Sequence, residues 1–285
     1  MNKIKTLVLD FSELVMFRHS VFSLPFIFIA MFVAADGWFG WRLLILGILA
    51  TVSARNFAMS VNRYLDKDID SLNIRTKNRP SVDGRISDRA ILFFIIINAT
   101  LFVGVSYFIN ALAFKLSAPI LLVLGAYTLF KRFSSLAHLI LGVSLGLAPI
   151  AGAIAVSEAI PLWSLYLAIG VMFWVAGFDL LYSLQDMEFD KKHKLYSIPS
   201  KFGAQNTLRI ALVFHILTIL FWTLFVIKAS LGIWAHVAIF SSIIMLGYEH
   251  YLIRKDFTKI DRAFFTVNGY LGFIFLVFII IETSL

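Results

Sequence analysis

The sequence contains no cysteine, few prolines and few charged residues. Without cysteine, the chain has no disulfide, no thiolate metal site and no cysteine nucleophile. Only 15% of its residues are charged, whereas soluble domains usually carry about 25%. What the sequence does contain is 60% hydrophobic residues, with 29 phenylalanines and a mean hydropathy of +0.88. This composition excludes an ordinary soluble domain and indicates an integral membrane protein in contact with membrane lipid.

The net charge of +8 has a topological explanation. No basic stripe with interleaved aromatic residues is present, so we expect no nucleic-acid partner. The basic residues instead lie in short segments between hydrophobic runs, as the positive-inside rule requires of a membrane protein.

Hydrophobic runs predict about nine transmembrane helices, because a spanning helix needs about 20 mostly apolar residues. The expected spans are residues 20–36, 41–62, 90–112, 115–130, 135–156, 161–182, 207–227, 231–252 and 264–283. The predicted fold class is therefore all-α, a multi-spanning transmembrane bundle formed by residues 1–285 as a single domain.

The distribution of basic residues supports this number of spans. With the N-terminus in the cytoplasm, 21 of the 25 Lys and Arg residues fall in cytoplasmic segments. Only Arg42, Lys115 and Lys228 fall outside, and Arg55 lies within a span. This asymmetry predicts an N-in, C-out orientation, with the two long polar loops, 67–89 and 187–206, in the cytoplasm.

Two acidic motifs mark the starts of those loops. Asn62, Asp66 and Asp70 are four residues apart, a spacing that turns a helix by about 400° and keeps the three on one face. Tyr182, Asp186 and Asp190 repeat the spacing, and both aspartate pairs are separated by 120 residues. The equal separation predicts two pseudo-repeated halves of four helices, with a ninth helix added.

Stacked carboxylates repel each other unless a cation lies between them. Hard oxygen ligands favour Mg²⁺ or Ca²⁺ over softer metals, and Mg²⁺ typically combines one or two carboxylates with substrate phosphates. The motifs therefore predict a diphosphate site with two metal ions, and the alternative is a pair of solvated helix ends. The basic residues Arg75, Lys77 and Arg79 follow the first motif and would contact the diphosphate, although the positive-inside rule also explains them.

Charged residues within a span are costly and are functional candidates by default. Arg55 lies seven residues before Asn62, and Asp179 lies seven before Asp186, so each shares a helix face with its motif. We expect both to line one cavity, and the alternative is a buried ion pair between them. Three further inward-facing candidates lie near helix ends, where interfacial snorkelling is the alternative: Arg18, Tyr127 and Lys131.

A metal–diphosphate site beside an aromatic-rich apolar interior suits an isoprenyl diphosphate. Metal ions and basic side chains would draw the diphosphate away, and aromatic side chains would stabilise the allylic cation. A phenolic acceptor would attack through a ring carbon, and a base would remove the ring proton.

The two motifs, together with the run from Arg75 to Pro80, resemble the UbiA superfamily of intramembrane prenyltransferases over nearly the whole chain. The resemblance implies a nine-helix bundle, two Mg²⁺ ions and a cavity open to lipid. It implies that metal and diphosphate are held by Asn62, Asp66, Asp70, Asp186 and Asp190, and that diphosphate is contacted by Arg75, Lys77 and Arg79. The implied cavity residues are Tyr127, Lys131, Asp179 and Tyr182, with Asp179 and the four motif aspartates as catalytic residues.

The stretches 53–63 and 178–186 are similar to bacterial 4-hydroxybenzoate polyprenyltransferases. We therefore expect a polyprenyl diphosphate donor and an aromatic acid acceptor in quinone biosynthesis, at a bacterial inner membrane with the active site facing the cytoplasm. Arg55 or Arg18 would bind the acceptor's carboxylate. Open alternatives are a dihydroxynaphthoate acceptor in menaquinone biosynthesis, protohaem farnesyl transfer and, in another class, a membrane transporter.

Overall fold

The computed structural model describes residues 3–16 and 24–285, and within these residues it contains helices and no β-strand. The chain forms two compact units that interleave in sequence. The first unit comprises residues 1–20 and 45–129, and the second comprises residues 21–44 and 130–285. The arrangement within each unit is described separately.

The helices of the first unit are α1 (Lys3–Leu14), α3 (Trp41–Leu65, from residue 45 onward), α4 (Lys67–Leu72), α5 (Asp88–Ile109) and α6 (Ala111–Ala126), followed by the start of the 3₁₀ helix η2 (Tyr127–Arg132). The long helices of the second unit are α2 (Leu24–Ala35), α7 (Ala137–Ser157), α8 (Leu162–Ser183), α10 (Ile198–Lys228), α11 (Ile233–Lys255) and α13 (Asn268–Ser284). Its short elements are η3 (Leu184–Asp186), α9 (Met187–Lys192), η4 (Phe257–Lys259), α12 (Ile260–Arg262) and the π-helical η5 (Ala263–Val267).

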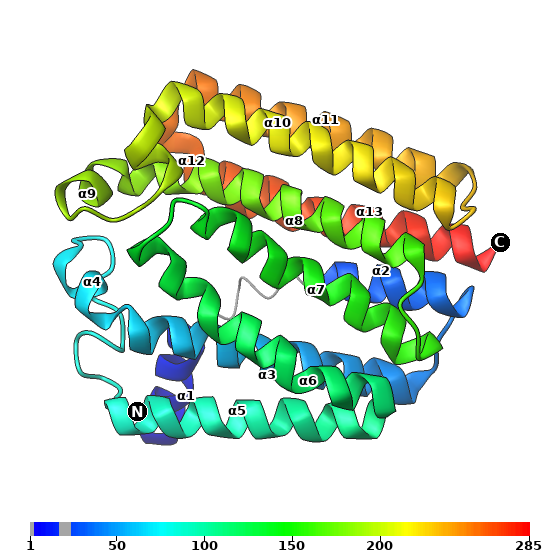
Figure 1. The fold of residues 1–285 in the computed structure, drawn as a ribbon, viewed down its shortest axis with the longest axis horizontal. Helices are drawn as coiled ribbons and strands as arrows, with labels where there is room; N and C mark the ends of the chain where they lie inside the picture. The colour runs from blue at the N-terminus through cyan, green and yellow to red at the C-terminus, as the bar shows by residue number, and fades with distance from the viewer. Residues whose placement is uncertain (1–2, 17–23) are drawn as a thin grey trace. The chain divides into compact units, whose positions relative to one another are not determined.

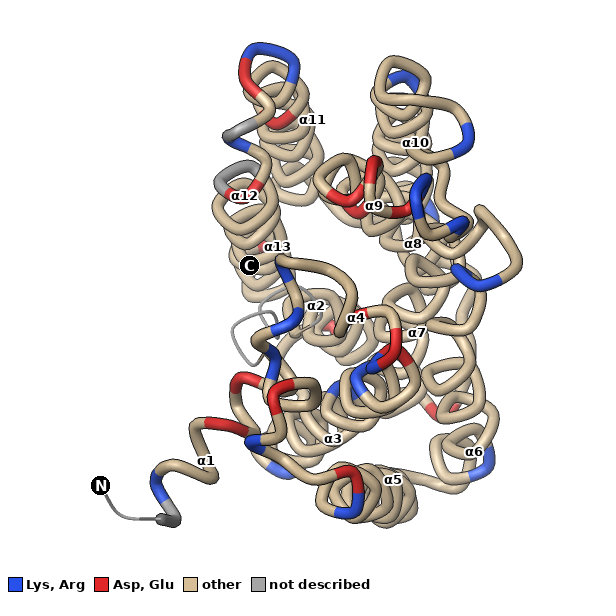
Figure 2. The backbone as a smooth tube through the Cα atoms, turned by 90° about the vertical axis from the view of Figure 1, so that its left-hand side faces the viewer, with Lys and Arg blue, Asp and Glu red and all other residues tan. Residues whose placement is uncertain are grey.

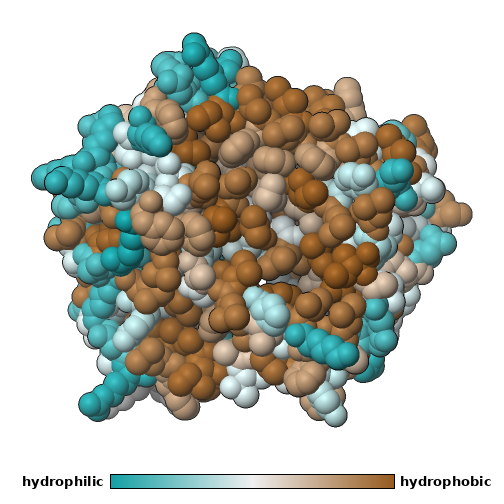
Figure 3. All heavy atoms as spheres, viewed as in Figure 1, coloured by the Kyte–Doolittle hydropathy of each residue, from teal (hydrophilic) through white to brown (hydrophobic). Residues whose placement is uncertain are grey.

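Eight of the described helices are long and apolar enough to cross a membrane, and α2 is a shorter apolar helix. The nine predicted spans therefore all correspond to helices, which confirms the all-α, multi-spanning fold. Hydrophobic residues cover the middle of the face shown in Figure 3, and hydrophilic residues gather at its left and right margins. Such a surface is expected when a hydrocarbon layer about 30 Å thick surrounds the protein.

Helix α8 is a central element of the second unit. It packs between α7 and α10, while α2 packs against α7 and α13, and α11 packs against α10 and α13 (Figure 1). Gly142 of α7 lies so close to α8 that a Cβ there would come within 2.2 Å of the Met172 carbonyl oxygen. Small residues that let helix backbones approach are the usual source of helix association in lipid, where burial of apolar surface contributes little.

Aromatic side chains fill the interior of the second unit. Phe26, Trp174, Trp222 and Phe275 are all fully buried. Phe26 lies 5.0 Å from Trp174, 5.3 Å from Trp222 and 6.1 Å from Phe275 between ring centroids. Large rings supply many dispersion contacts at once, so they stabilise a helix bundle that lipid surrounds.

A buried polar network also ties helices of the second unit together. The Trp174 indole donates to Asn268 at 2.8 Å, and the Asn268 amide donates to Glu249 at 2.6 Å. The His215 Nδ1 and His250 Nε2 atoms lie 2.9 Å apart. These contacts link α8, α10, α11 and α13, and they give one polar partner to groups that are costly to bury alone.

The predicted internal repeat is visible in the backbone. Asp66 has φ −93° and ψ 6°, and Asp186 has φ −98° and ψ 1°. Each aspartate precedes a six-residue helix, α4 or α9, at the same offset of 120 residues. The two halves therefore share a local structure at the position where each acidic motif lies.

Three details differ from the sequence-based expectation. The polar loops 67–89 and 187–206 contain α4 and α9, and α10 begins at Ile198 because Ser197 and Ser200 form a reciprocal capping box. Helix α10 continues across a kink at Gly203, whose φ of +77° favours glycine. Helix α1 was not expected, because its twelve residues are too few for a span.

Candidate functional site

The first acidic motif lies at the junction of α3 and α4. Asn62 is in the last turn of α3, Asp66 lies between the two helices, and Asp70 is in α4. The backbone amides of Asp66 and Asp70 donate to the carbonyls four residues earlier, at 2.9 Å and 2.8 Å. Helical backbone hydrogen bonds therefore continue through the motif, even though the helix is interrupted at Asp66.

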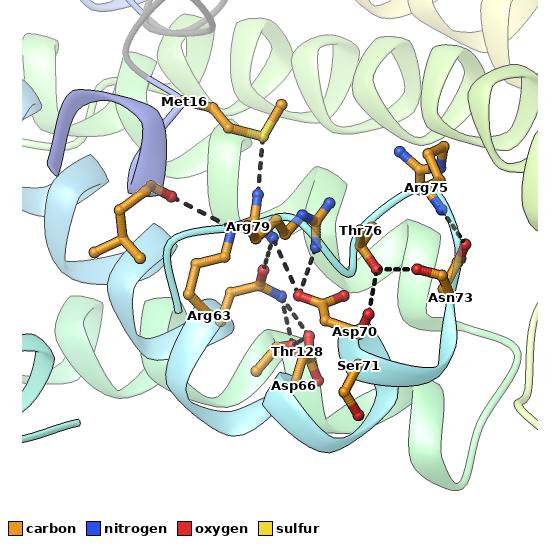
Figure 4. A network of polar contacts seen from close by, with 12 residues as sticks. Met16, Arg63, Asp66, Asp70, Ser71, Asn73, Arg75, Thr76, Arg79 and Thr128 are labelled. Atoms are coloured by element: carbon orange, nitrogen blue, oxygen red, sulfur yellow. Dashed lines mark hydrogen bonds and ion pairs between the residues drawn. The ribbon is translucent and has the colours of Figure 1, made fainter. Parts of the chain in front are cut away.

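The Asp66 carboxylate is 1% exposed and belongs to a compact hydrogen-bonded group (Figure 4). Its Oδ2 atom accepts from the Thr128 hydroxyl at 2.6 Å and from the Asn62 amide at 2.7 Å. Asn62 also donates to Thr128 at 2.7 Å. The group fixes the side-chain orientation of Asp66, which a metal ligand needs.

The Asp70 carboxylate faces two arginines. Its Oδ2 atom accepts from Arg79 Nη1 at 2.6 Å and lies 3.9 Å from Arg63 Nη1 (Figure 4). The Asp70 side chain is only 7% exposed, so most of its compensation comes from these cations. The Thr76 hydroxyl donates to the Asp70 carbonyl at 2.9 Å, which fastens the following loop to α4.

Arg63 and Arg55 both anchor the end of α1. Arg63 donates to the Leu14 carbonyl at 3.3 Å, to Met16 Sδ at 2.8 Å and to Asn62 Oδ1 at 2.9 Å. Arg55 donates to the Val15 carbonyl at 2.7 Å and the Met16 carbonyl at 3.1 Å. The last carbonyls of a helix lack partners within it, so the two guanidinium groups cap α1.

The loop that follows α4 places its basic residues differently. Arg75 and Lys77 are exposed, whereas Arg79 is half-buried beside Asp70. Farther along, Arg85 donates to Glu13 at 2.6 Å and to Asp83 at 2.8 Å, and these hydrogen bonds raise the pKa of Arg85. These contacts connect the loop to α1.

Arg85 also affects the carboxyl group of Asp83. Desolvation raises the pKa of that carboxyl, but the hydrogen bonds from the Arg85 amide and guanidinium, together with the Arg85 charge, outweigh it. The pKa of Asp83 therefore lies below its ordinary value. The loop end is thus held by charge as well as by backbone geometry.

The second acidic motif lies in the second unit, and Figure 2 marks acidic residues on both α4 and α9. Asp186 ends η3, and Asp190 lies in α9 with its carbonyl accepting from the Leu195 amide at 2.9 Å. The next amide, that of Tyr196, donates to the Lys131 carbonyl at 2.9 Å. The Tyr182 ring lies 4.4 Å from the Phe264 ring, centroid to centroid.

Asp179 has a histidine partner within the second unit. Its Oδ2 atom lies 2.7 Å from His138 Nδ1, in the first turn of α7. The Asp179 side chain is 23% exposed, whereas that of His138 is 8% exposed. The two charged residues expected within spans, Arg55 and Asp179, thus each have a partner within their own unit.

The donor atoms suit a hard divalent cation. Among the described residues, no group of three or more His, Cys, Asp or Glu side chains is assembled for a metal ion. Each acidic motif offers two carboxylates, and Mg²⁺ typically uses one or two when substrate phosphates complete its coordination. Asp66 and Asp70 would hold such an ion in the first unit, and Asp186 and Asp190 in the second.

The structure brings Asn62, Asp66, Asp70 and Arg79 together within the first unit. Arg18 lies outside the described residues, and Tyr127 is half-buried at the start of η2. Sequence reasoning missed Arg63, Thr128 and the partnership of His138 with Asp179. Arg63, a charged residue beside Asn62 at a span's end, carried a usable signal, whereas Thr128, 62 residues from Asp66, carried none.

Comparisons with known proteins agree with this geometry. Residues 23–279 match the UbiA prenyltransferase family. The "4-hydroxybenzoate octaprenyltransferase" of Herminiimonas arsenicoxydans is 27% identical over 245 residues, which cover 85% of each chain. A UbiA homologue from Aeropyrum pernix K1, solved in the apo state, has a TM-score of 0.84 at 29% identity and covers 93% of this chain and 98% of its own. A UbiA homologue from Archaeoglobus fulgidus, bound to GPP and Mg²⁺, has a TM-score of 0.77 at 21% identity and covers 97% and 100%.

Proposed function

Because the chain belongs to the UbiA prenyltransferase family, we propose that it transfers a polyprenyl chain from an allylic diphosphate to an aromatic acid. The observation that carries the proposal is the pair of buried carboxylates, Asp66 and Asp70, at a helix junction that recurs 120 residues later at Asp186 and Asp190. The name of the Herminiimonas relative supports a 4-hydroxybenzoate acceptor. A dihydroxynaphthoate acceptor is the alternative.

The donor's diphosphate would be bound through two Mg²⁺ ions, one at each acidic motif, and a homologue from Archaeoglobus is bound to GPP and Mg²⁺. Asp66, oriented by Asn62 and Thr128, would hold one ion together with Asp70, and Asp186 and Asp190 would hold the other. When bound, the two ions neutralise the negative charge of the leaving diphosphate.

Basic side chains of the first unit would complete the diphosphate site. Arg75 and Lys77 are exposed, and Arg79 is half-buried beside Asp70. Arginine binds phosphate through two parallel N–H groups and lysine through a point charge. These residues would hold the diphosphate as its bond to the prenyl C1 atom breaks.

The acceptor would bind through residues of both charge types. A fixed cation, Arg55 or Arg18, would bind the ring carboxylate, and Asp179 would accept the ring proton. Tyr127, Lys131 and Tyr182 remain the predicted cavity residues. Exclusion of water is essential here, since water would quench the allylic cation.

The cellular setting follows from charge and composition. The 21 basic residues assigned to one side would put both acidic motifs at the cytoplasmic face. We place the protein in a bacterial inner membrane, with its C-terminus outside. A C-terminal reporter that is active only in the cytoplasm should remain silent.

The proposal is tested by product mass spectrometry on the purified protein. Geranyl diphosphate and Mg²⁺ are supplied with 4-hydroxybenzoate or 1,4-dihydroxynaphthoate, and the expected product is one acid plus one prenyl group. Asp66→Asn and Asp190→Asn should abolish it, while the exposed Arg209→Ala should not. A wild-type protein that prenylates neither acid would contradict the proposed acceptor class.

A further inference from the structure

The His138–Asp179 pair lies on a closely packed pair of helices. His138, Gly142 and Gly146 are four residues apart on α7, and a Cβ at Gly146 would come within 2.8 Å of the Ala168 carbonyl on α8. The two glycines therefore bring the α7 backbone against α8, and His138 lies one turn before them. This contact holds the imidazole at a fixed position beside the Asp179 carboxylate.

The contact determines where the imidazole proton lies. An ionised carboxylate only accepts hydrogen bonds, so across the 2.7 Å separation only a tautomer with its proton on His138 Nδ1 can donate to it. His138 Nε2 is buried and has no hydrogen-bond partner among the described residues. The imidazole thus makes one polar contact, and that contact orients Asp179.

The two side chains differ in exposure, which indicates different roles for them. The Asp179 side chain is 23% exposed, so part of it is open to the surroundings, whereas the His138 side chain is only 8% exposed. In hydrolytic dyads and triads a buried partner orients the reacting group in the same way. Here the roles of the two groups are exchanged: the carboxylate is the reacting group, and the imidazole is the buried group that orients it.

We propose that His138 is the positioning residue of Asp179, and that its Nδ1–H holds the carboxylate in the orientation that accepts the acceptor's ring proton. This inference rests on the proposed prenyl transfer. In that reaction a ring carbon bonds to the prenyl C1 atom, and the C1–O bond electrons leave with the diphosphate. The proton on the substituted ring carbon passes to Asp179 Oδ1, its bonding electrons restore the aromatic ring, and the proton is then released to water.

Two substitutions at His138 distinguish the effect of the position of its N–H group from the effect of side-chain size. The amide of His138→Asn presents an N–H near the position of Nδ1, whereas that of His138→Gln presents one near Nε2. We expect His138→Asn to retain most of the wild-type kcat, and His138→Gln to lose about a hundredfold, because misplacing a reacting group by about 1 Å costs that much. The KM values for both substrates should stay near wild type.

A ring-deuterated acceptor supplies the readout that a purely structural role would not change. With 4-hydroxybenzoate deuterated beside its hydroxyl, His138→Gln should show a primary isotope effect, because proton removal becomes rate-limiting. Wild type and His138→Asn should show none. His236→Gln, at an exposed histidine near the start of α11, is the matched control and should behave as wild type.

The outcomes distinguish this inference from the proposed function. A wild-type protein without prenylated product refutes the proposed function itself. An active wild type with equal activities in His138→Asn and His138→Gln, and no isotope effect in either, overturns the positioning role. If both variants unfold in detergent, ¹⁵N-histidine NMR of the wild-type protein decides: a proton on Nδ1 of His138 supports the inference, and one on Nε2 alone overturns it.

Discussion

Replacing Arg79 should have opposite effects on metal binding and on donor binding. The Arg79 guanidinium lies 2.6 Å from the carboxylate of Asp70, which we propose as a metal ligand. On that proposal, metal and arginine would compete for Asp70. When donor binds, Arg79 would leave the carboxylate and contact the diphosphate, so that one side chain stabilises both states of the site.

The magnitudes follow from the surroundings of the pair. A charge-assisted hydrogen bond contributes about 1.5–3 kcal/mol, which corresponds to roughly tenfold to a hundredfold in affinity. Arg79→Ala should raise the KM of the prenyl diphosphate by such a factor. It should cost less folding stability than the about 3–5 kcal/mol of a fully broken buried pair, because Arg63 remains 3.9 Å from Asp70 and Arg79 is itself 22% exposed.

Two measurements on purified protein test this exchange. Titration with Mn²⁺ in the absence of donor should show tighter binding in Arg79→Ala than in wild type, and steady-state kinetics should show the raised KM. Arg79→Lys should fall between the two, and Arg209→Ala controls for the loss of an exposed arginine. Unchanged Mn²⁺ affinity together with an unchanged KM would refute the exchange.

Three other predictions follow from the same structure. Excess chelator should abolish turnover and Mg²⁺ should restore it; activity that persists in chelator rules out the metal-dependent mechanism. Glu282 accepts hydrogen bonds from the Gly232 and Trp234 amides at the start of α11. Glu282→Ala should therefore lower the stability of the fold by about 1 kcal/mol, as the loss of a helix cap does. Thermal unfolding measures this change, and Glu188→Ala at an exposed glutamate is the control. Gly142→Ala should lower the free energy of unfolding by about 1–3 kcal/mol, because the added methyl group would clash with α8. Gly104→Ala should be neutral or stabilising, because a Cβ at Gly104 meets nothing within 4 Å. Equal effects of the two substitutions would contradict the close packing of α7 on α8.

Most of the fold could be predicted from hydropathy alone, because the nine apolar runs are long and the basic residues alternate between the segments that connect them. Family membership confirms that the chain is a prenyltransferase, so the alternative of a transporter is wrong. Helix α1 was missed because its twelve residues are too short to span, and it is fastened by tertiary contacts from Arg55, Arg63 and Arg85. Such contacts leave no periodic signal in the sequence.

The candidate site was predictable where its residues belong to one helical segment. The spacing of Asn62, Asp66 and Asp70 indicated a shared face, and the structure places Asn62 in hydrogen-bond contact with Asp66. Thr128 and His138 were not predictable as partners, since each meets its carboxylate across a helix–helix contact. The single-domain prediction and the roles of the site residues remain predictions.

Comparing the two halves of the internal repeat shows which residues occur in both halves and which occur in only one. An offset of 120 residues pairs Asp66 with Asp186 and Asp70 with Asp190, and the aspartates are identical in both halves. The same offset pairs Arg63 with Ser183 and Arg79 with Pro199, so the arginines around Asp70 have no basic counterpart in the second half.

The reverse holds for the acid that contacts His138. The residue 120 positions before Asp179 is Met59, so the first half has no equivalent carboxylate at that position. The shared aspartates fit the metal binding that we propose for each half. The unshared residues fit the proposed roles that differ, which are diphosphate binding by cations in the first half and proton removal by Asp179 in the second. On this argument, Arg79→Ala should change the kinetics of the donor, and His138→Gln should change the chemistry of the acceptor.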